Sequence, residues 1–258
     1  MREKVFLGAV LALLAVVATA GAVKSSERIE LRAGNLIVVG HGGFRPETLP
    51  KHHDAPIVFF GGGKISTVSG EVPPILEKID FEYDRQGSVD TTGLGVCTYG
   101  KLVATDVPAA RRACGDAIVG RGTGTAVVTF PEQAPIPTTS PITIFNGPKK
   151  HGLDTVLVHA HLEVPSPSTI LFPVVIERIH NGLYAYRTQV KIPELANGYG
   201  HPVSGFIRIG RKWTYRGERH SYVNARCETG RLQLHGKFRF KDGTLLAGTF
   251  FKQCKVRE

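Results

Sequence analysis

Apolar and polar residues alternate in short runs over most of the chain beyond residue 54. The clearest run is residues 231–241, RLQLHGKFRFK, in which every odd position is polar and every even position is apolar or glycine. Because successive side chains of a β-strand point to opposite faces, this run predicts a strand with one buried face and one solvated, basic face. Residues 79–84 and 156–164 alternate in the same way, and turn-forming residues separate the runs. The fold class is therefore predicted to be all-β, either an antiparallel sandwich or a barrel-like sheet.

Two-residue turn signals join several of the predicted strands. Asn181-Gly182 lies between two apolar runs and is typical of a tight β-hairpin. Asp242-Gly243 predicts a second hairpin, in which Phe240 lies opposite Leu245. Antiparallel pairing of neighbouring strands follows from both signals.

One segment, residues 106–119, has a helical pattern instead. Asp106 suits the N-cap position, and Pro108 is tolerated in the first turn. The glycine-rich segments 61–63 and 120–124 do not open a helix as a phosphate-binding loop does, and we interpret them as turns between strands. One short helix is therefore expected in the chain.

The domain organisation follows from where these patterns begin and pause. Residues 23–54 carry no clear pattern and are predicted to be a flexible N-terminal segment. A boundary near residues 147–152 would divide a β unit at 55–148 from a basic antiparallel β unit at 149–258. One continuous domain is the alternative that the sequence leaves open.

The first residues have the pattern of a secretory signal peptide. In residues 1–22, Arg2 and Lys4 precede an apolar stretch, and small residues allow cleavage after Ala20 or Ala22. The stretch is shorter than the roughly 20 apolar residues that a membrane-spanning helix needs, so an uncleaved anchor is the lesser alternative. The protein is expected to be secreted or held at the cell envelope, with no transmembrane span after cleavage.

Four cysteines remain in the mature chain, and an even number in an exported protein predicts two disulfides. Three pairings are possible. We favour Cys97 with Cys114 and Cys227 with Cys254, because each pair closes a modest loop within one half of the chain. The predicted hairpin register supports the second pair, since it places Cys254 opposite Arg231, close to Cys227. The spacings do not match those of zinc or thioredoxin-type sites.

Several short segments spread over most of the mature chain carry a resemblance to other proteins. They are VPPIL at 72–76, GLGVC at 93–97, residues 110–114, FPEQ at 130–133, FNG at 145–147, HAH at 159–161, YG at 199–200, residues 206–215 and DGT at 242–244. In these segments the chain resembles a group of secreted proteins of actinobacteria whose function is unknown. The resemblance implies an exported, disulfide-bearing β protein, and it implies no catalytic residues.

Composition and charge narrow the classes of protein further. The 258 residues are 42% hydrophobic and 21% charged, which excludes a disordered, collagen-like or polytopic membrane chain. The formal net charge is +10. Residues 23–148 contain 12 basic and 13 acidic residues, whereas residues 149–258 contain 18 and 8. The basic excess therefore belongs to the second half of the chain.

Basic residues in that half form the main candidate for a binding surface. A row of cations along one strand face fits an extended polyanion, such as an anionic envelope polymer or a polysaccharide, and predicts no specific nucleic acid. The alternative is a solvated face whose charges prevent pairing between sheet edges. The candidate residues are Arg231, Lys237, Arg239, Lys241, Arg208 and Lys212.

A second group of residues is a weak candidate for metal binding. His159, His161 and Glu163 share one strand face, and their side chains are suitable ligands for zinc, copper or iron. Spacing fixes no further ligand, so no cofactor is predicted. Motifs of nucleophilic catalysis such as G-x-S-x-G are missing from the sequence. We therefore expect a non-catalytic binding or structural protein, with a metal-dependent secreted enzyme centred on these three residues as the alternative.

Overall fold

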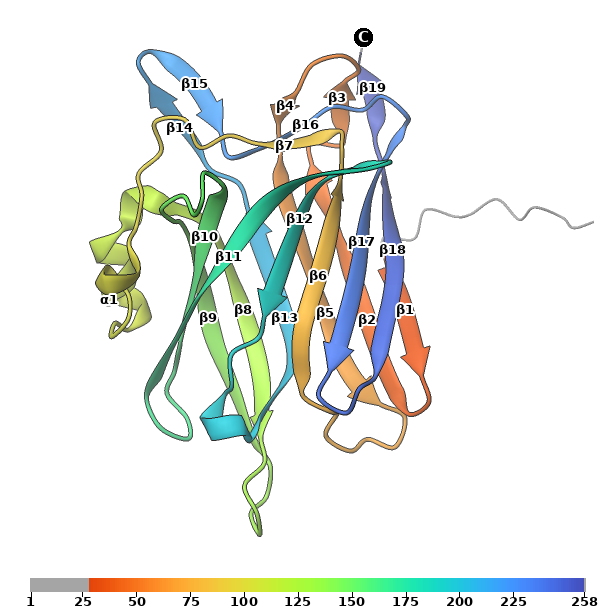
Figure 1. Ribbon diagram of the computed structural model, residues 1–258, viewed down its shortest axis with the longest axis vertical. Coiled ribbons are helices and arrows are strands. Elements are labelled where there is room, and N and C mark those ends of the chain that lie inside the picture. Colours follow the sequence, from red (N-terminus) through yellow and green to blue (C-terminus); the bar gives the residue numbers. More distant parts are fainter. Residues whose placement is uncertain (1–27, 258) are drawn as a thin grey trace, which may run out of the picture.

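One large antiparallel sheet of twelve strands forms the body of the protein (Figure 1). This computed structural model describes residues 28–257, so the predicted signal peptide at residues 1–22 lies outside the described residues. The predicted all-β class is confirmed, and the sheet is barrel-like. In spatial order its strands are β1 (Arg28–Ala33), β2 (Leu36–Arg45), β5 (Val58–Thr67), β13 (Gly200–Ile209), β8 (Ile118–Val128), β9 (Ile136–Asn146), β10 (Asp154–Leu162), β11 (Ser168–Asn181), β12 (Tyr184–Lys191), β6 (Leu76–Asp84), β17 (Arg231–Phe240) and β18 (Leu245–Gln253).

The short strands lie at one end of the large sheet, and the helix α1 lies on its outside (Figure 1). A three-stranded sheet joins β4 (Ala55–Pro56), β16 (Val223–Ala225) and β7 (Gly87–Val89), and a hairpin joins β14 (Lys212–Tyr215) and β15 (Glu218–Ser221). β3 (Thr48–Pro50) pairs in parallel with β19 (Lys255–Arg257). The helices are α1 (Val107–Ala113) and the 3₁₀ turns η1 (Tyr99–Lys101), η2 (Gly115–Ala117) and η3 (Ala196–Gly198).

The large sheet coils until its two end strands, β1 and β18, lie side by side (Figure 1). Side chains make this contact. A Cβ at Gly248 of β18 would come within 2.6 Å of Ile29 Cδ1 and 2.7 Å of Leu31 Cδ2 on β1. The absence of a side chain at position 248 therefore leaves room for Ile29 and Leu31 where the two ends of the sheet meet.

The predicted helix is present but shorter than expected. The Asp106 carboxylate accepts a hydrogen bond from the Ala109 amide at 2.7 Å, which confirms the predicted N-cap. α1 ends at Ala113 instead of residue 119, because Ile118 already begins β8. The helix packs against β9 and β10 on the outside of the sheet.

Residues 28–50 form strands where the sequence analysis expected a flexible segment, so that prediction is corrected here. Leu36 and Val38 of β2 are buried, and Gly34 has a positive φ of 54° in the tight turn between β1 and β2. The buried positions alternate over only a few residues before glycines follow in the sequence. Such a short alternation does not stand out without its partner strand.

The hairpin at Asp242-Gly243 is also corrected, by one residue. Arg239, not Phe240, lies opposite Leu245. The Phe240 amide donates to the Thr244 carbonyl oxygen at 3.0 Å, so the loop contains three residues instead of two. Three-residue loops that end on a glycine with positive φ share the same sequence signal as two-residue loops. The whole predicted register of β17 and β18, including the residue placed opposite Arg231, shifts accordingly.

The glycine-rich segments are not turns, which is a third correction. Residues 61–63 lie inside β5 and residues 120–124 lie inside β8. A Cβ at Gly62 would collide with the carbonyl oxygen of Gly205 on the neighbouring β13. These glycines therefore allow adjacent strands of the coiled sheet to approach closely.

Strands from the two halves of the chain alternate within the large sheet. β13 from the second half lies between β5 and β8 from the first, and β6 lies between β12 and β17. Residues 147–152, near the predicted boundary, connect β9 to β10 within one antiparallel pair. Both halves therefore contribute to the same enclosed interior.

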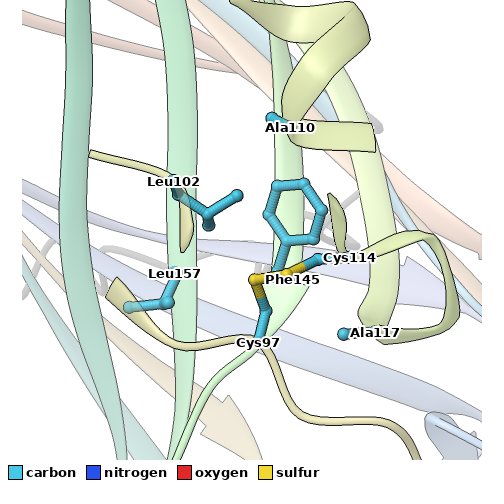
Figure 2. Packing of buried hydrophobic residues seen from close by; sticks show 7 residues of the cluster. All are labelled: Cys97, Leu102, Ala110, Cys114, Ala117, Phe145 and Leu157. Carbon is cyan, nitrogen blue, oxygen red and sulfur yellow. A yellow bond between two sulfur atoms is a disulfide. The ribbon is translucent and has the colours of Figure 1, made fainter. Parts of the chain in front are cut away.

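Both predicted disulfides are confirmed, Cys97–Cys114 and Cys227–Cys254. Figure 2 shows the first one between the α1 region and the sheet, with the ring of Phe145 beside it. The other members of this buried cluster are Leu102, Ala110, Ala117 and Leu157. The disulfide thus closes the segment that contains α1 into a loop, and this loop packs against Phe145 of β9 and Leu157 of β10.

Candidate binding cavity

An apolar cavity of about 250 Å³ lies inside the barrel-like sheet. Strands from around the sheet contribute inward-facing side chains to its lining, including Phe59 of β5, Phe81 of β6, Val158 of β10 and Phe250 of β18. Because side chains alternate along each strand, the apolar face of each predicted strand is the one that faces this interior. The enclosed space is therefore a direct product of the alternating pattern in the sequence.

Inward positions on four strands explain why the interior is not filled. A sheet of twelve strands encloses a wide space, and only large side chains reach across it. β9, β10, β11 and β13 instead place valine and isoleucine at the cavity, and their medium-sized side chains leave space in the middle. These residues are Ile144, Val156, Val158, Val174, Ile176, Ile207 and Ile209.

Packed side chains lie toward both ends of the barrel. Toward the end that contains the turn between β1 and β2 lies a buried apolar cluster whose members do not line the cavity; it consists of Leu36, Val38, Ile65, Leu76, Phe240 and Leu246. At the other end, Val223 and Ala225 of the small sheet β4–β16–β7 line the cavity. The cavity therefore occupies the part of the barrel between a packed cluster and a small covering sheet.

One buried carboxylate, that of Asp84, lies at the cavity lining. It accepts hydrogen bonds from the backbone amide of Gln86 at 2.9 Å, from Gln86 Nε2 at 3.1 Å and from the Gln233 amide at 3.0 Å. Asp84 continues the alternation of Asp80 and Glu82 along the sequence, but its side chain is buried. Its charge is balanced by donors of the protein itself.

Lys252 of β18 is the buried cation at the cavity. Its Nζ lies 2.9 Å from Oε1 of Glu47. The hydrogen bond and the positive charge of Lys252 hold the pKa of Glu47 below its usual value. The charge of Lys252, like that of Asp84, is thus balanced by contacts inside the protein.

Two tyrosine hydroxyls at the cavity differ in their partners. The hydroxyl of Tyr83 lies 3.1 Å from Oγ1 of Thr188. Tyr222 is only 2% exposed, and its hydroxyl has no hydrogen-bond partner among residues 28–257. Burial raises the pKa of Tyr222 far above its usual value, so the hydroxyl keeps its proton. Tyr222 therefore presents an unused hydrogen-bonding group in an apolar surrounding.

The basic residues selected from the sequence lie outside the barrel and away from the cavity. Lys237 of β17 lies opposite Asp80 of β6, and Lys241 Nζ lies 2.9 Å from Oε1 of Glu194. Acidic side chains thus accompany the basic row. The four exposed residues of this row are Arg231, Lys237, Arg239 and Lys241.

Arg208 and Lys212, the other two members of the candidate surface, do not join that row. Arg208 lies on β13, and Lys212 begins β14 just beyond it. In the strand order, β5, β2, β1 and β18 separate β13 from β17 on the shorter side. The structure therefore divides the predicted basic surface into two separate parts.

The histidine candidates share a strand face, as predicted, but that face is partly covered by the segment that contains α1. His159 is fully buried, and its Nε2 lies 3.0 Å from the Thr105 carbonyl oxygen. His161 Nδ1 lies 3.2 Å from Thr169 Oγ1. Its Nε2 lies 3.7 Å from Glu163 Oε1, and the Glu163 side chain is 76% exposed. Within residues 28–257, no three His, Cys, Asp or Glu side chains are gathered as ligands of one metal ion.

A polar pair that sequence reasoning missed lies near the β14–β15 hairpin. His220 Nδ1 lies 2.8 Å from Asp90 Oδ2, and the His220 ring stacks on Trp213 at a centroid distance of 5.5 Å. Burial favours a raised pKa for Asp90, but hydrogen bonds from Thr92 and His220 outweigh it and lower that pKa. No sequence motif joins residues 90 and 220, so only the fold reveals the pair.

No family model, curated protein or solved structure matches this chain. Within the described residues, 28–257, no helix has the length and apolar character required to span a membrane.

Proposed function

We propose that this protein is an exported, non-catalytic binding protein that holds one small apolar molecule inside its barrel-like sheet. The cavity of about 250 Å³ with its apolar lining is the observation that supports this function most strongly. Ligand sites in proteins are mostly apolar, concave and equipped with few polar groups, as this interior is. Export is supported by the predicted signal peptide and is compatible with two disulfides.

The volume sets the size of the molecule. An engineered apolar cavity of about 150 Å³ binds benzene, which has six carbon atoms. In proportion, a cavity of about 250 Å³ accommodates a compact molecule of about ten carbon atoms. Bicyclic hydrocarbons and their simple derivatives have this size.

Stability gives a second reason to expect an occupant. An unfilled cavity costs about 24 cal/mol per Å³ in core-truncation experiments, which for about 250 Å³ amounts to roughly 6 kcal/mol relative to a filled interior. That is comparable with the whole stability of an ordinary domain, about 5–15 kcal/mol. An apolar ligand would restore the missing packing contacts.

Calorimetric titration of the secreted, disulfide-bonded protein with indane, a bicyclic hydrocarbon of nine carbon atoms, tests the proposal. We expect saturable binding of one molecule per chain and a rise in the melting temperature with ligand concentration. Titration without saturation, together with an unchanged melting temperature, would contradict the proposed function.

Contact with an anionic polymer is a second candidate function, which one observation on the outer face favours. Lys191 of β12, Lys78 of β6 and Arg239 of β17 lie directly side by side across three adjacent strands. A cation row of this kind attracts a polyanion in a salt-dependent way. Retention on an anionic polysaccharide column should weaken steeply with salt, and it should be lost on replacing the basic residues by serine; equal retention of the variant would reject this function. The residues to replace together are Arg231, Lys237, Arg239 and Lys241.

A further inference from the structure

We infer that the ligand of the cavity is an uncharged apolar molecule with one carbonyl or hydroxyl oxygen, and that this oxygen forms a hydrogen bond with the hydroxyl of Tyr222. The inference rests on the proposed function, because it names the chemistry of the molecule that the cavity holds. Three features of the lining support it: the position of Tyr222, its missing partner, and the contacts that the charged groups of the lining make within the protein.

The backbone holds Tyr222 firmly beside the cavity. It lies between β15 and β16, where its amide donates to the Arg211 carbonyl oxygen at 2.8 Å and its carbonyl oxygen accepts from the Asp90 amide at 3.1 Å. Its ring packs in a buried cluster with Leu94, Val119 and Ile144. The backbone and the ring of Tyr222 are therefore both held in place, and its hydroxyl has little freedom to reach another partner.

A ligand would supply the hydrogen-bond partner that the hydroxyl of Tyr222 lacks. Buried tyrosine hydroxyls usually find a hydrogen-bond partner, because an unpaired polar group in an apolar surrounding is unfavourable. Among the side-chain atoms of residues 28–257 that are buried without a partner, the hydroxyl of Tyr222 is the one whose residue lines the cavity. A ligand oxygen within reach would remove this penalty.

The charged groups of the lining argue for an uncharged ligand. Asp84 accepts three hydrogen bonds from the protein, and Lys252 pairs with Glu47. The Tyr83 hydroxyl contacts Thr188. A charged ligand would have to enter an apolar interior without an uncommitted counter-charge, which is strongly unfavourable.

A matched pair of probes tests the inference. Indane and 1-indanone share one bicyclic skeleton and differ by a single carbonyl oxygen. Calorimetry should give a Kd for 1-indanone that rises about five- to tenfold in Tyr222→Phe, which removes only the hydroxyl, while the Kd for indane stays within about twofold. Tyr83→Phe is the control, because its hydroxyl already contacts Thr188; the Kd for 1-indanone should change less than in Tyr222→Phe.

The infrared band of the bound ketone provides a measurement on the wild-type protein, which does not depend on the folding of any variant. A hydrogen bond to the carbonyl oxygen should shift the stretching band of bound 1-indanone to lower frequency than in a hydrocarbon solvent. If both probes bind but the band is unshifted, or if Tyr222→Phe binds both probes as the wild type does, the inference is overturned and the proposed function stands. If neither probe binds, the proposed function fails and the inference with it.

Discussion

Gly122 on β8 faces the carbonyl oxygen of Phe206 on β13 so closely that a Cβ at position 122 would collide with it. Such close approach of neighbouring backbones accompanies the strong coiling of the sheet, which brings β1 and β18 together and encloses the cavity. Glycine at position 122 is therefore expected to be a requirement of the fold, although position 122 lies inside a strand.

Replacing this glycine should destabilise the protein strongly. Gly122→Ala is expected to lower the free energy of unfolding by roughly 2–4 kcal/mol, because the obstructing atom belongs to the backbone and cannot turn aside. Gly205→Ala in β13 is the matched control: the nearest atom to its new Cβ lies 3.9 Å away, so a change below about 1 kcal/mol is expected. Urea denaturation measures both values, and equal losses would contradict the steric explanation.

Filling the cavity should prevent binding without unfolding the protein. Val158→Phe adds a ring at an inward position of β10, and we expect the Kd for indane to rise at least tenfold while the fold persists. Val68→Phe, at a residue that is 65% exposed, is the control and should bind indane normally. Calorimetry measures the Kd for indane, and circular dichroism shows whether the variant is folded. An unchanged affinity in Val158→Phe would show that indane binds elsewhere.

The Cys97–Cys114 disulfide should stabilise the protein without shaping the cavity. Changing both cysteines to serine should lower the free energy of unfolding by about 3 kcal/mol, as expected for a loop with a sequence separation of 17. The bond lies outside the sheet, against β9 and β10, so the affinity for indane should remain within about twofold. Denaturation in guanidinium tests the loss of stability, and titration with indane tests the affinity. Lost binding in a folded variant would show that the disulfide does shape the cavity.

His159 should make the stability depend on pH near neutrality. Burial holds its pKa below the ordinary value of 6.5. The unfolded chain therefore binds a proton more readily than the folded one, and stability should fall as the pH drops below about 6.5. Between pH 7 and pH 5, the free energy of unfolding of His159→Gln should change less with pH than that of the wild type. His180→Gln, at an exposed position, should show the pH dependence of the wild type. Identical profiles for all three proteins would reject this role.

Local features of the sequence predicted local features of the fold correctly. The alternation in residues 231–241 gave a strand, Asp106 gave the helix N-cap, and the cysteine spacings gave both disulfides. Each of these depends on neighbouring residues or on a short loop. The register at Asp242-Gly243 was wrong by one residue because two- and three-residue loops share the same signal.

The cavity could not be predicted, because it depends on the order of the strands. Phe81 and Val158 both line it, although β6 and β10 are separated in the sheet by β11 and β12. Tyr222 carries no motif, and its missing partner becomes visible only when the residues around it are placed. The sequence pattern indicated which faces are apolar, but it did not indicate how far apart they lie.

Diffraction from a crystal of the wild-type protein under xenon pressure tests the central claim most directly. Xenon enters dry apolar cavities and scatters strongly. The structure predicts a xenon peak inside the barrel, in contact with Phe81 and Val158. An interior filled by protein side chains, with no xenon between these two residues, would contradict the account.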